Sequence, residues 1–340
     1  MTNSNKFLWR ILQTAVWSLG VGIVVALFWW PEIGIHSFWN ILIPVAPALL
    51  AIAPGLWRNI CPMASNALVL RHTGKSARKP VSSKWQGRFF LIGVVLLYAI
   101  VPLRHVILDL NGPSTGIALL ATAGLAIIMG SQFEWKSGWC SGICPVHPVE
   151  RLYGSSPVAS LPNAHCFPCE QCVTPCTDAA EGLDPLSIPN GKSRQIAGSL
   201  MVGGFAGFIW GWFQVPDYAD GEGWAHLGQA FAWPLSGTVV TLALFHLLKP
   251  RVSPVLLRRV FAAAAIACYY WYRLPALFGY GLFPKDGMLI DLRDSLGTSF
   301  PYISRVLTTA FFFWWLVGRR NLNRSWLIRP AMAKVQNQDS

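Results

Sequence analysis

Charged residues are scarce in this sequence: Asp, Glu, Lys and Arg make up only 12% of its 340 residues, about half of the ~25% usual in soluble domains. The sequence also lacks a glycine-rich phosphate loop, a dinucleotide-binding fingerprint and a hydrolytic triad. These absences argue against a soluble enzyme and against nucleotide-dependent or hydrolytic chemistry. The charge that is present is mostly positive, with a formal net charge of +12. Because the cations lie in loops between apolar runs, they indicate the positive-inside bias of a membrane protein, and we expect no nucleic-acid partner.

Long apolar runs dominate what remains. A membrane span needs ~20 apolar residues, and eight segments are candidates. Five contain no charged residue: Ile11–Trp30, Ser37–Trp57, Gly112–Phe133, Gln195–Val215 and Trp224–Leu248. Three are weaker because they are short or carry an arginine: Phe89–Leu103, Val260–Tyr272 and Phe300–Val317. No small-residue cleavage site follows the first run, so we expect a membrane span there and not a cleaved signal peptide. The predicted fold is an all-α polytopic membrane protein with about eight transmembrane helices.

The loops differ in charge on the two sides of these spans. All but five of the 27 Lys and Arg residues lie in loops or tails on one side. The other side holds an acidic loop at Asp217–Glu222 and the loop Lys285–Asp294. The positive-inside rule makes the basic side cytoplasmic. We therefore predict a multi-pass protein of a bacterial inner (plasma) membrane with both termini in the cytoplasm.

Eight cysteines are present, and seven of them fall on the predicted cytoplasmic side. Four form a C-x2-C-x2-C-x3-C run: Cys166, Cys169, Cys172 and Cys176. Zinc sites usually pair two C-x2-C units across a longer spacer, and disulfides are disfavoured in a reducing compartment. The run instead matches the ligand spacing of a 4Fe–4S cluster, so these four cysteines are the predicted ligands. Cys268 lies inside a predicted span and is interpreted as a core residue.

Two shorter Cys-Pro motifs resemble each other. The segment from Trp57 to Met63 aligns with the segment from Cys140 to Val146, and both contain Ile-Cys-Pro. We interpret them as copies of a duplicated two-helix unit in which Trp57 replaces the leading cysteine of the second copy. Cys140 and Cys144 share a face if they lie on a helix and could then chelate a metal; Pro145 could instead open a turn, and the thiols could be ordinary surface groups.

A second cluster is one interpretation of the remaining thiols. Together with Cys176, the three cysteines of the short motifs would make four ligands, enough for a second cubane: Cys61, Cys140 and Cys144. In the alternative, Cys176 completes the first cluster. The predicted organisation is a four-helix membrane unit at 1–133 with the first Cys-Pro motif, a cytoplasmic iron–sulfur insertion at 134–195, and a C-terminal four-helix membrane unit at 196–340 with a basic tail.

Buried arginines could mark a further site on the outer side. Arg104, Arg273 and Arg305 map to similar depth there, with His36, His105 and His226. One interpretation is a quinone pocket, since ionisable groups within membranes tend to be functional. The other is snorkelling of the arginines to the interface, with Asp109 or Asp291 as partners. A haem held by His105 and His226 is the least favoured alternative.

In these motifs the chain resembles the NapH/NosR/CcoG-type membrane-bound ferredoxin-like (polyferredoxin) proteins, over roughly residues 37–180. The resemblance implies that the Cys166–Cys176 run ligates a cluster and that Cys140 and Cys144 form the C-x3-C-P pair of that family. This chain departs from the family in having one complete ferredoxin run and in Trp57. Members look like electron conduits between a quinone pool or cytoplasmic donors and other redox enzymes, and some look like copper reductases.

The predicted function is therefore electron transfer, as a component or as an oxidoreductase. A cytoplasmic ferredoxin- or flavodoxin-like donor would pass electrons through the cluster to a quinone or to a membrane or periplasmic redox partner. The alternative is cluster-assisted copper reduction for metalloenzyme assembly, since soft thiolates such as Cys140 and Cys144 favour Cu(I). Substitution of both Cys140 and Cys144 distinguishes the possibilities. Loss of copper reduction with an intact cluster would support copper handling, whereas loss of iron would support a second cluster.

Overall fold

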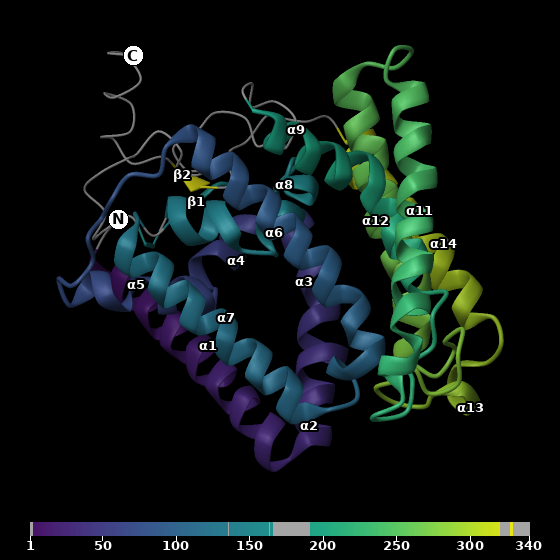
Figure 1. Cartoon of the computed structure of the whole chain (residues 1–340). Helices are drawn as coiled ribbons and strands as arrows, with labels where there is room; N and C mark the ends of the chain where they lie inside the picture. Colours follow the sequence, from purple (N-terminus) through teal and green to yellow (C-terminus); the bar gives the residue numbers. More distant parts are fainter. Residues whose placement is uncertain (1–2, 135, 163, 166–190, 320–326, 329–340) are drawn as a thin grey trace.

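A computed structural model describes residues 3–134, 136–162, 164–165, 191–319 and 327–328 (Figure 1). The α-helices of the first half are α1 (Asn3–Trp29), α2 (Pro31–Ile35), α3 (Ile43–Ile52), α4 (Pro54–Ile60), α5 (Pro62–His72), α6 (Ser83–Leu103), α7 (Gly112–Gln132) and α8 (His147–Tyr153). Those of the second half are α9 (Lys192–Ser199), α10 (Phe205–Trp212), α11 (Leu227–Leu248), α12 (Pro254–Leu277), α13 (Arg293–Leu296) and α14 (Phe300–Phe313).

Several α-helices are continued or connected by π-helical or 3-10 segments. The π-helical segments are η1 (His36–Leu42), η2 (Arg104–Leu108), η3 (Lys136–Ile143), η4 (Leu200–Gly204) and η6 (Trp314–Gly318), and η5 (Gly223–His226) is a 3-10 turn. In the described part of the chain, strand pairing is limited to β1 (Leu161–Pro162), which runs parallel to β2 (Leu327–Ile328), and to one isolated bridge between Lys79 and Phe133. The all-helical prediction is therefore confirmed for the described residues, apart from this short pairing.

Six helical segments are long and apolar enough to cross a membrane, as expected of a multi-pass membrane protein. They are Lys6–Trp29, Pro31–Ile52, Lys84–Leu108, Gly112–Gln132, Gly223–Leu248 and Phe300–Gly318. They correspond to six of the eight predicted spans, and they include two of the three weaker ones, Phe89–Leu103 and Phe300–Val317. Many of their apolar side chains face outward, such as Val239 and Val240 on α11, which suits contact with lipid.

The other two predicted spans are helical but less apolar. Gln195–Val215 corresponds to α9, η4 and α10, and Val260–Tyr272 lies within α12. Helix α12 carries arginines near both ends, while the segment from α9 to α10 is rich in glycine. Both pack against protein on several sides and supply much of the main hydrophobic core, so they need less apolar surface than a helix that faces lipid. The count of eight spans remains a prediction.

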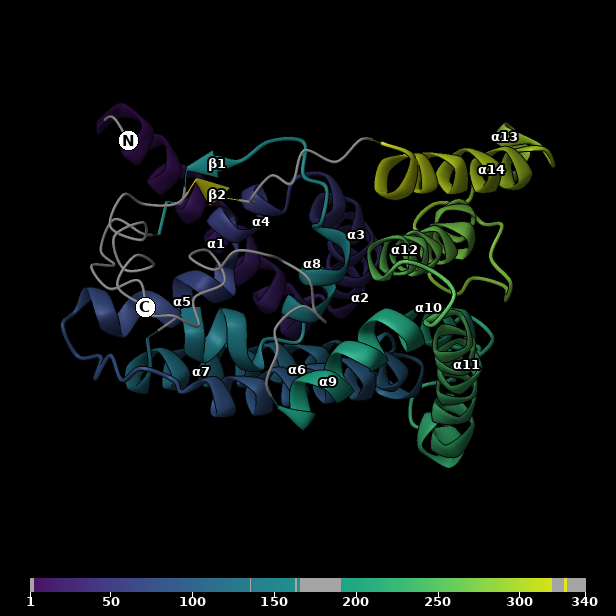
Figure 2. The ribbon, with the colours of Figure 1, turned by 90° about the horizontal axis from the view of Figure 1, so that it is seen from above.

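The helices form two neighbouring groups. Seen from above, α10, α11, α12 and α14 lie on one side, and α1, α5, α6 and α7 on the other (Figure 2). Glycine allows close packing within the second half of the chain: a Cβ at Gly203 would lie 2.8 Å from the Phe245 ring. Such small residues let membrane helices approach each other.

The described part of the predicted insertion is packed against the bundle. Trp139 in η3 and Tyr153 in α8 are each only 1% exposed. Trp139 joins a cluster with residues of α5 and α7, while Tyr153 belongs to the main core. The segments around Trp139 and Tyr153 are thus part of the packed interior of the bundle.

Candidate functional site

The first Cys-Pro motif forms a sharp turn between two helices. Helix α4 ends where the Cys61 N–H donates to the Trp57 carbonyl at 2.9 Å. Pro62 then occupies the first position of α5, where its missing N–H costs nothing. The Cys61 carbonyl accepts from the Ala64 N–H at 3.1 Å and closes the turn. The thiol of Cys61 therefore sits at a fixed helix–helix junction.

The second motif is also a turn that follows a helical segment, but that segment is π-helical and Pro145 lies in the turn, outside the next helix. The Cys144 N–H donates to the Trp139 carbonyl at 3.2 Å. This hydrogen bond, between residues five apart as in a π-helix, marks the end of η3. Pro145 follows, and the Cys144 carbonyl accepts from the His147 N–H at 3.2 Å before α8 begins. Cys140 thus lies within η3, while Cys144 follows its last residue, Ile143, and the predicted turn is present at Pro145. The shared turn agrees with the interpretation of the motifs as copies.

The two motifs bring three predicted ligands together at one end of the bundle, which we call the thiol end. Cys61 and Cys140 pack on the same pair of buried α5 residues, Ala64 and Leu68. Cys140 and Cys144 both pack against the cluster around Trp139. All three are partly buried. Among the described residues, however, no three His, Cys, Asp or Glu side chains lie close enough to hold a metal ion.

A glycine on α6 permits this arrangement. A Cβ at Gly93 would lie 3.1 Å from the carbonyl oxygens of both Ile143 and Cys144. A larger side chain would push the end of η3 away from α6. The Cys144 turn can therefore rest directly on the α6 backbone.

A buried ion pair joins the two motifs. The Arg58 Nη1 lies 2.6 Å from Glu150 Oε2, and both side chains are nearly inaccessible. Burial alone raises the pKa of Glu150, but the charge of Arg58 and a hydrogen bond from His147 outweigh it and leave this pKa below its usual value. The carboxylate is therefore ionised and cross-links the first motif to the second.

His147 completes this frame. Its Nδ1 lies 3.2 Å from Glu150 Oε2, and an ionised carboxylate can only accept, so Nδ1 carries the proton. Burial lowers the pKa of His147 to about 4, against the raising effect of Glu150. The imidazole is thus neutral near pH 7, and its buried Nε2 lone pair has no hydrogen-bond partner in the described part of the chain.

The thiols are also held in their neutral form. Burial raises the pKa of Cys144 well above its usual value, and the neighbouring Cys140 and Cys61 raise it further. Burial, aided by the charge of Glu150, likewise raises the pKa of Cys61. A bound cation would have to displace these protons, as in other thiolate metal sites.

The chain that leads to the ferredoxin-type run is anchored at the same place. Asn59, two residues before Cys61, is fully buried. Its Oδ1 accepts from the Ala164 N–H at 3.0 Å, and its Nδ2 donates to the Pro162 carbonyl at 2.8 Å. The sequence then continues through His165 into the predicted cluster ligands. All four of these, Cys166, Cys169, Cys172 and Cys176, lie outside the described residues.

Sequence reasoning missed the residues that frame the thiols. Arg58 and Arg71 were counted as loop cations, yet both are buried and paired with Glu150 and Glu134. The available signal was a pair of rare acidic residues that flank the second Cys-Pro motif, Glu134 six residues before Cys140 and Glu150 six residues after Cys144. His147, three residues after Cys144, was not singled out either.

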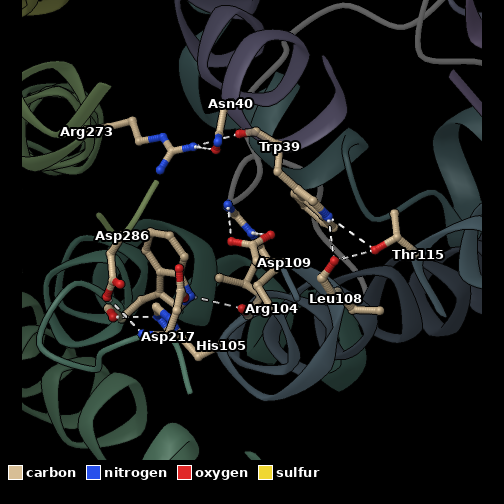
Figure 3. Close-up of polar contacts among 12 residues, drawn as sticks. Trp39, Asn40, Arg104, His105, Leu108, Asp109, Thr115, Asp217, Arg273 and Asp286 are labelled. Carbon is tan, nitrogen blue, oxygen red and sulfur yellow. Dashed lines mark hydrogen bonds and ion pairs between the residues drawn. The ribbon is translucent and has the colours of Figure 1, made fainter. Parts of the chain in front are cut away.

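The opposite end of α6 buries a second polar cluster, which we call the arginine end (Figure 3). The guanidinium of Arg104 contacts Asp109 through two bonds of 3.1 and 2.8 Å. It also lies 4.3 Å from the Trp39 ring centroid and 4.6 Å from that of Trp212. The predicted partnership of Arg104 with Asp109 is confirmed. Asp291, the other predicted partner, instead binds the exposed Arg293.

Loops from three parts of the chain meet at this end. His105 Nδ1 lies 2.5 Å from Asp217 Oδ1, and its Nε2 lies 3.0 Å from the Trp212 carbonyl. Both ring nitrogens are therefore occupied, while His226 stacks on Tyr218. This arrangement leaves His105 no nitrogen for a haem iron.

The acidic pair beside His105 has opposite pKa shifts. The Asp217 N–H donates to Asp286 Oδ2 at 2.8 Å. Burial would raise the pKa of Asp217, but the hydrogen bond with His105 outweighs it and leaves the pKa lower than usual. Burial and the Asp217 carboxylate raise the pKa of Asp286 to about 6.

Arg273 is held differently. Its Nη2 donates to the Trp39 carbonyl at 2.8 Å and to Asn40 Oδ1 at 2.5 Å, and no carboxylate of the described residues pairs with it. Arg305, the third predicted arginine, donates to the Trp271 carbonyl at 3.1 Å. The side chains of the three arginines are thus held by different hydrogen-bond acceptors: a carboxylate, an amide with a backbone carbonyl, and a backbone carbonyl alone.

Comparison of the chain with protein-family models, curated proteins and solved structures finds no match. The chemistry of the thiol end is therefore interpreted from its own geometry. The described residues supply the types of donor that a thiolate-bound metal centre uses, the uncharged thiols of Cys61, Cys140 and Cys144, but they do not form a complete set of ligands.

Proposed function

We propose that this protein is a membrane-bound iron–sulfur electron-transfer protein of the NapH/NosR/CcoG type. In this proposal eight helices cross a bacterial inner membrane, and the thiol end and both termini face the cytoplasm. Cys166, Cys169, Cys172 and Cys176 hold a 4Fe–4S cluster. Electrons pass between a cytoplasmic donor and a quinone or a membrane or periplasmic redox partner.

One observation carries this proposal. Two Cys-Pro turns, 83 residues apart in sequence, lie together at one end of the bundle and present Cys61, Cys140 and Cys144. Asn59 ties the start of the ferredoxin-type run to the same place. Three cysteines therefore lie at one end of the bundle, and the four of the ferredoxin-type run follow in sequence directly after the segment that Asn59 anchors there, which supports the proposal of a metal centre.

The described residues have clear roles in this proposal. The Arg58–Glu150 pair fixes the two turns relative to each other, and His147 is kept neutral beside them. Uncharged thiols lower the cost of the buried site until metal binding takes their protons. Once bound, an iron–sulfur cluster supplies one-electron redox chemistry.

The test is anaerobic purification followed by measurement of iron, acid-labile sulfide and the EPR spectrum of the reduced protein. We expect iron and sulfide in the native chain and a large loss of both in Cys169→Ser. Cys268→Ser is the matched control, because Cys268 packs in the main core on α12 and should leave the iron content unchanged. Colourless protein, or zinc in place of iron, would contradict the proposal.

Copper reduction is the second candidate, and one observation favours it. Cys140 and Cys144 are held on a single π-helical segment and its last hydrogen bond, so two soft donors are positioned without the ferredoxin-type run. A Cys140→Ser/Cys144→Ser double variant separates the two functions. Loss of copper reduction at unchanged iron content would support copper handling, whereas loss of part of the iron would support a second cluster.

A further inference from the structure

A segment that we call the basic strap, residues 73–88, joins α5 to the first turn of α6. It contains no Asp or Glu, and five of its cations are exposed. They are Lys75, Arg78, Lys79, Lys84 and Arg88. None of them forms an ion pair with a carboxylate of the described residues. The strap is therefore a positive surface that no carboxylate of the described residues neutralises.

The strap has a fixed conformation. The Ala77 N–H donates to the Ser131 carbonyl at 2.7 Å, and the Lys79 N–H donates to the Gln132 carbonyl at 3.1 Å. The Lys79 carbonyl accepts in return from the Glu134 N–H at 3.0 Å. These bonds fasten the strap to the end of α7, directly before the chain enters η3. The cations are thus placed in a defined pattern next to the thiol end.

Aromatic side chains connect the strap with the thiols. Trp85 is 51% exposed, and the Arg88 guanidinium lies 4.7 Å from the centre of its ring. The Trp85 and Phe89 rings are 5.9 Å apart, and Phe89 lies 5.9 Å from Phe133. Phe89 and Phe133 pack in the same cluster as Cys140. A continuous packed path therefore runs from the exposed surface to the thiol end.

We propose that the basic strap is the docking surface of an acidic one-electron carrier protein, with Trp85, Phe89 and Phe133 as the electron entry path. The inference rests on the proposed electron-transfer function and names the partner of its thiol end. The docked carrier is oxidised by one electron and the membrane protein is reduced by one electron, with no bond made or broken. Opposite charge would speed the encounter of the two proteins.

Anionic lipid is the competing occupant of a basic juxtamembrane segment. Two observations favour a protein. Lipid headgroups diffuse to meet cations in any arrangement, whereas the strap is held in one conformation by backbone hydrogen bonds. The exposed Trp85 also stands at the beginning of a packed path to Cys140, and attraction to lipid requires no such path.

The first test measures binding of a small acidic ferredoxin to the full-length protein in nanodiscs of phosphatidylcholine, which has no net charge. The variant Lys75→Glu/Arg78→Glu/Lys79→Glu should lower the association rate at low salt by about tenfold or more and flatten its salt dependence. The control Lys249→Glu/Arg251→Glu reverses two exposed cations in the turn between α11 and α12 and should change the rate by less than about twofold.

The second measurement is the rate of electron entry at saturating reduced ferredoxin, followed by stopped flow. Trp85→Leu should slow this rate about tenfold while the iron content stays unchanged. Equal effects of the strap and control reversals would overturn the inference, as would a strap effect confined to phosphatidylglycerol vesicles, which would identify a lipid surface. Iron-free protein would refute the proposed function separately, because the binding measurement needs no iron.

Discussion

At the thiol end, Arg58 and Arg71 each contact a buried carboxylate, whereas at the arginine end Arg273 is held by the oxygen atoms of Trp39 and Asn40. At the thiol end these charged groups are paired with each other. The neighbouring cysteine thiols and the His147 ring are uncharged. At the arginine end Arg104 is likewise paired with a carboxylate, Asp109, but Arg273 connects α12 to η1 through uncharged oxygen acceptors.

This difference suggests separate roles for the two ends. The Arg58–Glu150 pair links the two Cys-Pro turns, and Glu150 and Glu134 balance the charges of Arg58 and Arg71, beside thiols that are themselves uncharged. The polar contacts of the arginine end join η2, the loop after α10 and the loop after α12 through His105, Asp217 and Asp286. We infer that the arginine end holds the bundle together and that the thiol end carries the chemistry.

The largest expected effect comes from breaking the arginine end. Arg104→Leu removes both bonds to Asp109 and both ring contacts, and it leaves the Asp109 carboxylate unpaired in a buried setting. Loss of one partner of a buried pair typically costs about 3–5 kcal/mol. We expect a decrease of this size in the free energy of unfolding, measured in mixed micelles of dodecyl maltoside and SDS.

Arg293→Leu is the matched control for that prediction. Arg293 binds both carboxylate oxygens of Asp291 through its Nε and Nη2, as Arg104 binds Asp109, but its side chain is 61% exposed. Exposed pairs contribute little because water and salt screen them, so this variant should unfold like the wild type. Equal destabilisation by the two substitutions would show that burial does not distinguish them and would remove the structural role assigned to the arginine end.

Much of the membrane fold could be predicted from the sequence because lipid contact demands long apolar runs. The six most apolar helices were all predicted as spans. The two innermost segments, from α9 to α10 and α12, were harder to classify. These segments pack mainly against other helices and not against lipid. Glycine, tyrosine and arginine are therefore tolerated there, and they lower the hydropathy by which a span is recognised.

The candidate site was predictable to the extent that its residues follow local rules. Cys-Pro spacing identified the three thiols, and Asp109 was a candidate partner for Arg104 because the two are five residues apart. The Arg58–Glu150 pair spans 92 positions, and no local pattern connects such partners. His147 could not be recognised as buried and neutral until α8 was placed against α6.

A smaller effect should come from acid at the thiol end of metal-free protein. The pKa of His147 is about 4 in the folded chain against an ordinary 6.5, so the unfolded chain binds more protons between these values. The free energy of unfolding therefore has its full value above about pH 6.5, where the ring is neutral in both states, and it decreases as pH falls towards 4. At ~1.4 kcal/mol per pKa unit, the loss is about 3 kcal/mol.

His147→Leu tests this assignment. The variant should be less stable at pH 7 because Glu150 loses a hydrogen bond, but its unfolding free energy should decline less between pH 6.5 and 4. His246→Gln, at an exposed position on α11, should keep the wild-type slope. If His147→Leu declined as steeply as the wild type, His147 would not be the titrating group at the thiol end.

The smallest expected effect has the opposite sign and lies at the arginine end. Burial and Asp217 raise the pKa of Asp286 to about 6 from 3.8, so here the folded chain binds more protons, and stability falls as pH rises from about 4 to 6. Asp286→Asn keeps an oxygen that can accept from the Asp217 N–H and carries no charge. Because Asp286 is only partly buried, solvent screening limits the gain to about 1 kcal/mol at pH 7, and the gain should vanish below pH 4. A variant equally stabilised at pH 3.5 and pH 7 would show that the carboxylate charge is not the cause, and the two ends would then not respond to acid in opposite directions.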